Sequence, residues 1–400
     1  MNKLQYVKLK NCCDVIGGST PKRDVPEYWM NEIPWVTPKD ISSLESPFLD
    51  DAPEYISTKG YNSCSTYLLP KNSILLTTRA PIGNVAIAGR EMCTNQGFKS
   101  LVPHNGVDFL YLYYCIKHHS PKLQALGNGA TFKEISKKVV EDFQIPLPSL
   151  IEQKRIASIL DKADSARRKR QKAIELSEQL LHSVFLDMFG DPISNPKGYK
   201  LGKIGDLLSS VNYGTSSKAG ENGQFPILRM NNITYAGNWD LGNLKYIDMD
   251  EKERKKYTAE PGDILFNRTN SKELVGKTAV FREKEPYIFA GYLIRSKTNS
   301  LAEPEYISGF LNSAYGKKVL RNMCKSIVGM ANINAKEYQS IEILIPPIEE
   351  QQKYAKITKK IRLNISCYQY SLNKCDELFN SLSQKAFRGE LSKLSETEFA

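Results

Sequence analysis

The sequence lacks any apolar stretch that approaches the ~20 residues needed to cross a membrane. Its eight cysteines form no Cys-x-x-Cys pair, and it contains only four histidines. Cys115 and His118 have Cys-x-x-His spacing, but no second pair completes a tetrahedral zinc site. We therefore expect no membrane span, no metal site, no cofactor and reduced thiols.

The first twenty residues also lack the apolar core of a signal peptide, so we expect a cytoplasmic protein. The 400 residues, 41% hydrophobic and 25% charged, are typical of a globular chain with two or three domains. The net charge of +11 is spread evenly: residues 1–200 hold 26 basic and 21 acidic side chains, and residues 201–400 hold 29 and 23. Two similarly basic halves favour a polyanionic partner, for which nucleic acid is the natural candidate.

An internal repeat is the most informative feature of the chain. Residues 147–191 align without a gap with residues 345–389, at a constant offset of 198. Both copies open with a Pro-x-x-x-Glu-Gln motif, which runs from Pro148 in the first copy and from Pro346 in the second. Two unrelated amphipathic helices would share apolar positions by chance, but they would not readily share this opening and a common length.

Each copy of the repeat predicts one long helix. Apolar residues recur at heptad spacing in the first copy, with Ile156 and Leu160 near its start and Leu181 near its end. The second copy follows the same pattern, which is typical of a coiled coil. At ~1.5 Å per residue each helix is roughly 55 Å long. Two separate amphipathic helices on two cores are the alternative.

A mixed region of about 145 residues precedes each helix, and the two regions correspond more loosely. A Gly-Ser-Thr turn at residues 18–20 matches residues 214–216, and an apolar segment at 33–36 matches 225–228. Each region also has a turn before an apolar strand, then a short helix, and then a glycine loop (residues 127–131 and 329–332). Short strands with few helices predict an α/β domain. The chain order is therefore domain, long helix, domain, long helix.

This order resembles the specificity (S) subunit of type I DNA restriction-modification systems. The residues that carry the resemblance are Ile145 to Ile156, Ile345 to Gln351, Gly18 to Pro21, and Gly329 to Asn334. The resemblance covers nearly the whole chain. Its single motifs are loose, but their duplicated order is specific.

The resemblance implies an α/β fold in which two mixed target recognition domains are separated by two long helices that pair as an antiparallel coiled coil, with pseudo-two-fold symmetry. It implies recognition domains at residues 1–147 and 191–345, spacer helices at 148–190 and 346–393, and a tail at 394–400. It also implies that double-stranded DNA and two methylation subunits bind the chain, and that restriction subunits join the full complex. The resemblance further implies that the chain has no catalytic centre and is not itself an enzyme. From the motifs that open the helices we predict subunit contacts at Glu152, Gln153, Glu350 and Gln351.

Candidate DNA contacts follow from the chemistry of base and phosphate recognition. Arg and Lys suit guanine, Asn and Gln suit adenine, and Ser, Thr and Lys hold phosphates. In the first domain we predict contacts from Thr20, Lys22, Thr37, Lys39, Arg79, Asn84, Lys99 and Lys133. In the second domain we predict contacts from Lys218, Arg229, Asn231, Asn232, Arg268, Asn270, Lys272, Lys277 and Asn332.

The basic run from Arg167 to Arg170, with Lys172, leaves three interpretations open. A helix would distribute these side chains around its axis and place Arg170 on the heptad seam. The run then forms a solvated face, contacts DNA phosphates across the spacer, or binds an acidic partner surface.

Two other classes of protein compete with a DNA-binding subunit. A stand-alone DNA-modifying enzyme lacks support, because Gly276-Lys277-Thr278 misses the first glycine of a phosphate-binding loop. The acidic side chains between Asp248 and Lys256 superficially resemble a nuclease site, but such a charged run more often forms a solvated helix. A coiled-coil scaffold that binds no nucleic acid would explain the helices, but not two basic domains placed symmetrically around them.

Overall fold

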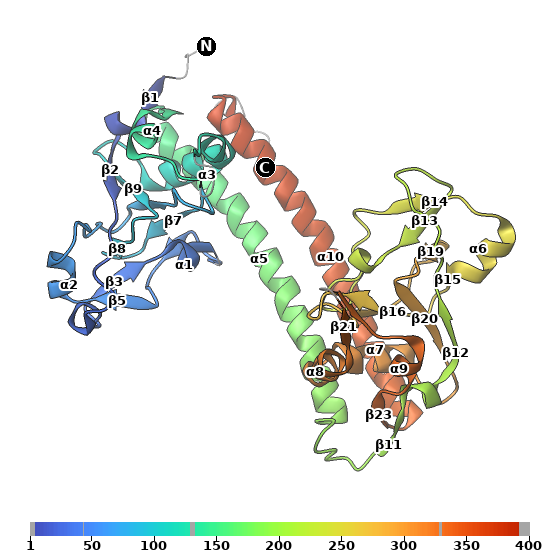
Figure 1. Cartoon of the computed structure of the whole chain (residues 1–400). Coiled ribbons are helices and arrows are strands. Elements are labelled where there is room, and N and C mark those ends of the chain that lie inside the picture. The colour runs from blue at the N-terminus through green and yellow to red at the C-terminus, as the bar shows by residue number, and fades with distance from the viewer. Residues whose placement is uncertain (1–4, 43, 129–132, 328–329, 392–400) are drawn as a thin grey trace. The chain divides into compact units, whose positions relative to one another are not determined.

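The computed structural model describes residues 5–42, 44–128, 133–327 and 330–391 (Figure 1). The chain divides into two compact units, which we call unit 1 (Met1–Gln171 with Tyr370–Ala400) and unit 2 (Lys172–Gln369). Each unit holds one mixed α/β domain and parts of both long helices. The tail at 394–400 and parts of both expected glycine loops lie outside the described residues.

The domain of unit 1 is built on two sheets. The larger sheet has five strands, in the order β2 (Cys13–Gly17), β9 (Lys99–Pro103), β6 (Ile74–Leu76), β7 (Val85–Ala88), β4 (Phe48–Leu49). The smaller sheet has three strands, in the order β5 (Glu54–Ile56), β3 (Ile33–Val36), β8 (Cys93–Thr94). Strands β1 (Tyr6–Lys8) and β10 (Gln144–Pro146) form a separate antiparallel pair. The helices of this domain are α1 (Pro38–Ser42), α2 (Thr58–Asn62), α3 (Phe109–Ala125), α4 (Lys137–Asp142).

The domain of unit 2 repeats this plan. One four-stranded sheet has the order β12 (Leu208–Tyr213), β20 (Leu293–Thr298), β16 (Ile264–Asn267), β18 (Thr278–Val280). Another has the order β14 (Lys245–Ile247), β13 (Phe225–Leu228), β19 (Tyr287–Phe289), β15 (Thr258–Ala259). A three-stranded sheet has the order β17 (Thr269–Asn270), β22 (Met330–Asn332), β21 (Lys325–Ile327). Strands β11 (Lys200–Lys203) and β23 (Glu342–Ile345) form a separate antiparallel pair. Its helices are α6 (Glu251–Tyr257), α7 (Pro304–Asn312), α8 (Ala314–Met323), α9 (Ala335–Gln339).

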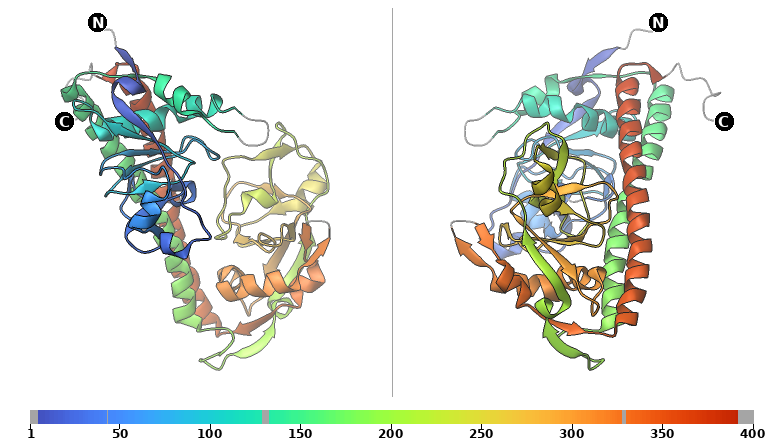
Figure 2. Two further views of the ribbon diagram at one scale, coloured as in Figure 1. Left: turned by 60° about the vertical axis from the view of Figure 1, so that its left-hand side comes forward. Right: turned by 90° about the vertical axis from the view of Figure 1, so that its right-hand side faces the viewer.

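The repeat predicted two long helices, and the structure confirms them as α5 (Leu150–Phe189) and α10 (Ile348–Phe387), each of 40 residues (Figures 1 and 2). Their bounds differ by the offset of 198 that the sequence shows. Helix α5 ends before Gly190, whose φ of 78° lies in the left-handed region that stops helices. Among described residues, no helix is both long and apolar enough to span a membrane.

Within each unit the two helices pair antiparallel. In unit 1 the start of α5, with Ile156 and Leu160, shares a core with Phe379 and Phe387 from the end of α10. In unit 2 the end of α5 shares a core with the start of α10, where the rings of Phe185 and Tyr354 lie 5.7 Å apart. Most of the predicted heptad seam is therefore buried within each unit, whereas the side chain of Arg170 is exposed. The remaining seam residues are partly buried: Ala163, Val184, Met188 and Tyr368.

A buried glutamine joins the start of each long helix to the neighbouring domain. In unit 1, Gln153 Oε1 accepts the N–H of Asp108, the residue before α3, at 2.9 Å, and its Nε2 donates to the Pro148 carbonyl at 2.9 Å. In unit 2, Gln351 Oε1 accepts the N–H of Glu303, the residue before α7, at 3.0 Å, and its Nε2 donates to Pro346 at 2.8 Å. The motif that opens both repeats therefore holds each domain on its helix.

This geometry corrects the expectation that Gln153 and Gln351 contact other subunits. Their side chains are 1% and 0% exposed, and their amides are fully engaged within the chain. Glu152 and Glu350 differ, because both retain exposed surface: Glu152 forms two hydrogen bonds with Arg155, and Glu350 accepts the hydroxyl of Tyr199 at 2.6 Å.

Two lysines are buried in unit 2. Lys277 was predicted to contact DNA, but it is 7% exposed and its Nζ donates to the Met230 carbonyl at 2.8 Å. Lys317 is 8% exposed, and its Nζ donates to the Tyr235 carbonyl at 2.6 Å and lies 3.6 Å from the centre of the Tyr235 ring. Burial lowers the pKa of Lys277, and burial together with Lys277 and Arg321 lowers the pKa of Lys317 to about 8.

Replacing Gln351 with alanine is expected to destabilise unit 2. The substitution leaves the Glu303 N–H and two carbonyls without their buried partner, which costs about 1–3 kcal/mol in the free energy of unfolding. Urea-induced unfolding measured with the tryptophan fluorescence of the full chain tests this. The exposed neighbour Gln352 provides the control, because Gln352→Ala should change stability by less than about 0.5 kcal/mol. Equal effects of the two substitutions would contradict the proposed role of Gln351.

The stability of the chain should rise with pH through Lys317. An unfolded lysine has a pKa near 10.4, so between about pH 8 and pH 10 the unfolded state binds more protons at this residue than the folded state. The free energy of unfolding should therefore increase over this range in the wild type, by on the order of 2–3 kcal/mol from this residue. Lys317→Met should lose that increase, whereas substitution of the exposed Lys318 by methionine should retain it. Urea unfolding at several pH values measures the difference, and parallel curves for wild type and Lys317→Met would refute it.

Candidate nucleic-acid interface

Five loops of unit 1 form one continuous surface at the ends of its strands. Backbone N–H groups join them: Ser19 donates to Thr94 at 3.0 Å, and Thr78 donates to Gly97 at 2.7 Å. The other two links run from Asn95 to Val36 at 3.0 Å and from Ile135 to Thr78 at 2.9 Å. We call residues 18–22, 37–42, 77–84, 94–99 and 133–135 loop face 1.

Unit 2 builds the corresponding surface with the same backbone hydrogen bonds. Thr215 donates to Phe289 at 3.0 Å, Ala290 to Leu228 at 2.9 Å, Arg268 to Tyr292 at 3.0 Å, and Ile333 to Arg268 at 2.9 Å. We call residues 214–218, 229–232, 267–277, 290–292 and 330–334 loop face 2. Thr78 and Arg268 occupy equivalent places in the two faces, as do Glu134 and Asn332. The loose correspondence of the two mixed regions in the sequence is therefore a real structural repeat.

Loop face 1 brings the predicted residues of the first domain together. Lys22, Lys39 and Lys133 are exposed and form no ion pair with any described residue. Arg79 and Lys99 instead share one carboxylate: Arg79 Nε lies 3.0 Å and Lys99 Nζ 4.0 Å from the oxygens of Glu134. Burial lowers the pKa of Lys99.

The neutral predicted residues of this face are held by local hydrogen bonds. Thr20 donates to Gln96 Oε1, and Asn84 Nδ2 donates to the Ser42 hydroxyl at 3.3 Å. Thr37 donates its hydroxyl to Asp40 at 2.8 Å. Thr20, Thr37 and Asn84 are partly exposed, so these bonds orient them at the surface without removing them from it.

Loop face 2 also gathers most of the predicted residues of its domain. Lys218, Asn231 and Lys272 are exposed. Arg229 is partly buried, and its Nη2 donates to the Asn243 carbonyl at 3.0 Å. Asn270, also partly buried, accepts the N–H of Ser271 at 2.9 Å.

Two predicted residues of the second domain have structural roles. Asn232 closes the short turn Met230–Asn232: its Oδ1 accepts the Arg229 N–H at 2.9 Å, and its Nδ2 donates to the Asp240 carbonyl at 2.9 Å. Asn232 is 2% exposed, and Lys277 is buried as described above. The prediction that these two side chains contact DNA is therefore wrong. The polar atoms of Asn232 are bonded within the turn and to Asp240, and the Lys277 ammonium is bonded to the Met230 carbonyl.

Sequence reasoning missed four residues of these faces. Gln96 and Glu134 organise loop face 1, while Tyr213 and Tyr292, 44% and 51% exposed, present aromatic rings on or beside loop face 2. The offset of 198 between the repeats also relates Glu134 to Asn332, so it could have found Glu134. No sequence signal separates the two tyrosines from the other nineteen in the chain.

The basic run on α5 is largely engaged within unit 1. Arg167 lies 2.9 Å from Asp164 on its own helix and 2.6 Å from Asp376 on α10, and Arg168 also pairs with Asp164. Lys172, the first residue of unit 2, lies 3.5 Å from Glu175. Because Asp164 is only 2% exposed, Arg167 and Arg168 compensate a buried carboxylate. The structure thus adds an internal role to the three interpretations left open by the sequence.

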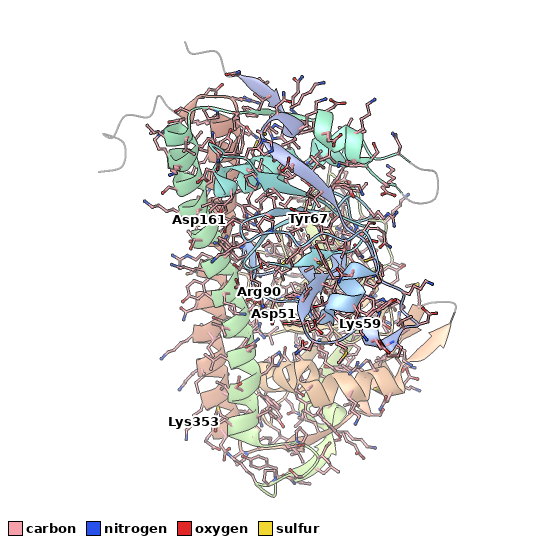
Figure 3. The ribbon with its side chains drawn as sticks, turned by 90° about the vertical axis from the view of Figure 1, so that its left-hand side faces the viewer. Asp51, Lys59, Tyr67, Arg90, Asp161 and Lys353 are labelled. Atoms are coloured by element: carbon pink, nitrogen blue, oxygen red, sulfur yellow. The ribbon has the colours of Figure 1, made fainter. Side chains whose placement is uncertain are left out.

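The charged run considered for a nuclease site forms a short helix at the surface. Helix α6, within the charged run from Asp248 to Lys256, buries no residue. Among the described residues, no group of three or more His, Cys, Asp or Glu side chains could hold a metal ion. Helix α3 packs on the long helix, where Tyr114 donates its hydroxyl to Asp161 on α5 at 2.9 Å. Figure 3 labels Asp161 on this helix.

The sequence is similar to a family of known proteins over most of its length. The family model described as "Type I restriction modification DNA specificity domain" matches the chain twice, at residues 1–177 and 196–371. The specificity subunit of type I restriction enzyme MjaIX from Methanocaldococcus jannaschii is 28% identical over 406 residues, covering 96% of this chain and 92% of that protein. The specificity subunit of type I restriction enzyme EcoKI from Escherichia coli is 27% identical, over 68% of this chain and 62% of its own length.

Solved structures agree in fold. The S subunit of a type I restriction-modification system from M. genitalium superposes with a TM-score of 0.61 at 15% identity, covering 97% of both chains. A chain from a study of assembly and conformational transition of the type I R-M system gives 0.51 at 18% identity, covering 98% of this chain and 100% of that one. Because the family model matches two segments that span most of the chain, each with one loop face, the protein belongs to the family of type I restriction-modification specificity (S) subunits.

Proposed function

We propose that the chain is the DNA-recognition subunit of a type I restriction-modification complex. Residues 1–147 and 191–345 are its recognition domains, and each loop face reads one half of a bipartite target in double-stranded DNA. The long helices set the gap between the half-sites and dock two methylation subunits, and restriction subunits join this core. The complex acts in the cytoplasm.

The observation that carries this proposal is the presence of two loop faces with the same backbone and different side chains. Thr78 in unit 1 is replaced by Arg268 in unit 2, and Glu134 is replaced by Asn332. An arginine and an amide suit purine edges in the major groove, whereas a carboxylate accepts a hydrogen bond from cytosine. Equivalent surfaces of unequal chemistry favour two different half-sites, and therefore an asymmetric target.

The surface of the long helices supports a docking role. In unit 2, Leu176 and Leu180 on α5 and Leu363 on α10 are 54%, 49% and 58% exposed; in unit 1, Tyr370 and Leu378 on α10 are 68% and 54% exposed. Exposed apolar side chains on a paired helix are typical of a surface that another chain covers. Lys353, on the exposed side of α10, adds charge near its start (Figure 3). Glu152 and Glu350 remain our predicted contacts for these partners.

In this proposal the chain contributes recognition and geometry but no catalytic group. The methyl donor binds the methylation subunits, and the chain itself needs no cofactor or metal. A scaffold that binds no DNA would leave the two loop faces without a role, and a stand-alone enzyme would require methylation or cleavage by the purified chain.

A map of methylated adenines tests the proposal directly. The chain is expressed with the methylation subunit encoded beside it in a host that lacks such a system, and N6-methyladenine is located by single-molecule sequencing. We expect one asymmetric bipartite motif with a fixed gap. Exchanging residues 1–147 for those of a related specificity subunit should change one half of the motif only. An intact complex that binds the methyl donor but adds no methylation would contradict the proposal, as would an exchange that alters both halves.

The role of the helices predicts a shorter gap when both lose one heptad. Deleting residues 169–175 from α5 and 365–371 from α10 removes seven residues from each and preserves the heptad seam. Seven residues at ~1.5 Å shorten each helix by ~10 Å, or about three base pairs of duplex DNA at ~3.4 Å per pair. The methylation map should show both half-sites unchanged and a gap shorter by about three. Deleting the heptad from α5 alone gives helices of unequal length and should abolish specific methylation. An unchanged gap after the paired deletion would refute the role of the helices.

A further inference from the structure

Arg268 stands at the centre of loop face 2 with its backbone held from both sides. It follows strand β16, donates its N–H to the Tyr292 carbonyl at 3.0 Å, and accepts the Ile333 N–H at 2.9 Å. These two bonds join it to two other loops of the face. The position of its Cα relative to the rest of unit 2 is therefore fixed before any ligand binds.

The side chain of Arg268 is also held in place. Its guanidinium carbon lies 4.9 Å from the centre of the Tyr213 ring, a cation–π contact. The Tyr213 hydroxyl accepts the N–H of Ala335 at 2.9 Å, which fixes the ring. Asn332 donates its Nδ2 to the Thr269 hydroxyl at 3.1 Å, so its Oδ1 is directed to Arg268 Nη2, 3.3 Å away.

Most hydrogen-bond donors of this guanidinium have no acceptor among the residues that the structure describes. A guanidinium has five N–H donors, and the bond to Asn332 uses one. The Nε atom is buried without a partner, and no carboxylate among the described residues forms an ion pair with Arg268. A buried hydrogen-bond donor without an acceptor lowers the free energy of unfolding, so unpaired donors on a partly buried side chain indicate a further role. Acceptors on a bound ligand would satisfy the unused Nη donors, whereas the buried Nε lies out of their reach.

Unit 1 has a different arrangement at the equivalent place. The residue equivalent to Arg268 is Thr78, which is buried and donates its hydroxyl to the Gly97 carbonyl at 3.2 Å. The nearby arginine, Arg79, is already bonded to Glu134 at 3.0 Å. An arginine with unused donors and no acidic partner at this central place is therefore a property of loop face 2.

We propose that Arg268 reads a guanine in the half-site recognised by unit 2, and that Tyr213 and Asn332 are its positioning residues. This inference rests on the proposed function and adds the base that one named residue selects. The planar guanidinium matches the O6 and N7 acceptors of guanine in the major groove. Its fixed, recessed position suits a base edge, because a phosphate contact needs only an exposed, flexible cation such as Lys272.

Binding competition with altered duplexes tests the assignment. The full chain in complex with its methylation subunit is titrated against the mapped target and against duplexes in which each base pair of both half-sites is changed in turn. In the wild type, one G·C pair in the unit 2 half-site should be preferred by roughly 10- to 100-fold. Arg268→Ala should lose this preference at that position alone. Asn332→Ala should reduce it at the same position, because the guanidinium loses its orientation.

Lys272→Ala is the matched control, because Lys272 is an exposed cation of the same loop face. It should weaken binding to all duplexes by a similar factor and keep every base preference. Unchanged preferences in the other half-site show, within the same measurement, that each variant is folded. Uniform weakening by Arg268→Ala would identify a phosphate contact and overturn the assignment, as would a wild-type half-site without a required guanine. If the wild-type complex shows no bipartite preference, the proposed function fails and the assignment fails with it.

Discussion

The core of each unit depends on aromatic side chains from the C-terminal end of a long helix. In unit 1 these side chains come from α10, and in unit 2 they come from α5. In unit 1 the ring of Phe387, at the end of α10, lies 5.8 Å from the ring of Tyr111 on α3. In unit 2 the ring of Phe189, at the end of α5, lies 4.7 Å from that of Tyr306 on α7. Large buried aromatic groups contribute much of the stability of a core, so each domain is completed by a helix that begins in the other half of the chain.

The two halves have kept the parts that build the structure and changed the parts exposed on the loop faces. Gln153 and Gln351 make the same bonds to the helix starts of their domains, and Tyr111 and Tyr306 both donate to a carbonyl just before the long helix. The loop faces share backbone hydrogen bonds, but Thr78 corresponds to Arg268. A repeated framework with divergent surfaces fits the proposed reading of an asymmetric bipartite target.

The long helices carry a buried or nearly buried charge of opposite sign in the two units. Each of these charges has partners of opposite sign. Asp164 on α5 is surrounded by Arg167, Arg168 and Lys117. The equivalent residue on α10 is Arg362, which donates to the Gly237 carbonyl at 3.1 Å and to Asn238, with Glu305 at 3.8 Å. An uncompensated buried charge would destabilise the helix pair by several kcal/mol. Arg167 and Arg168 of the basic run thus serve the packing of unit 1. In unit 2, Asn238 ties a loop to α10.

The sequence by itself determined the duplication, the two long helices and the mixed α/β domains, because periodicity and turn residues act locally and recur at a constant offset. It also predicted residues that the structure brings together on one loop face in each unit, since residues that follow strands gather at one end of a sheet. Only the tertiary structure decided which of these side chains remain available. Asn232 and Lys277 differ from their exposed neighbours Asn231 and Lys272 through bonds to carbonyls at Asp240 and Met230. Gln153 and Gln351 are likewise buried by contacts 45 and 48 residues away. Such long-range contacts leave no local pattern in the sequence, and they separate the residues that hold the framework from those that remain exposed on the loop faces.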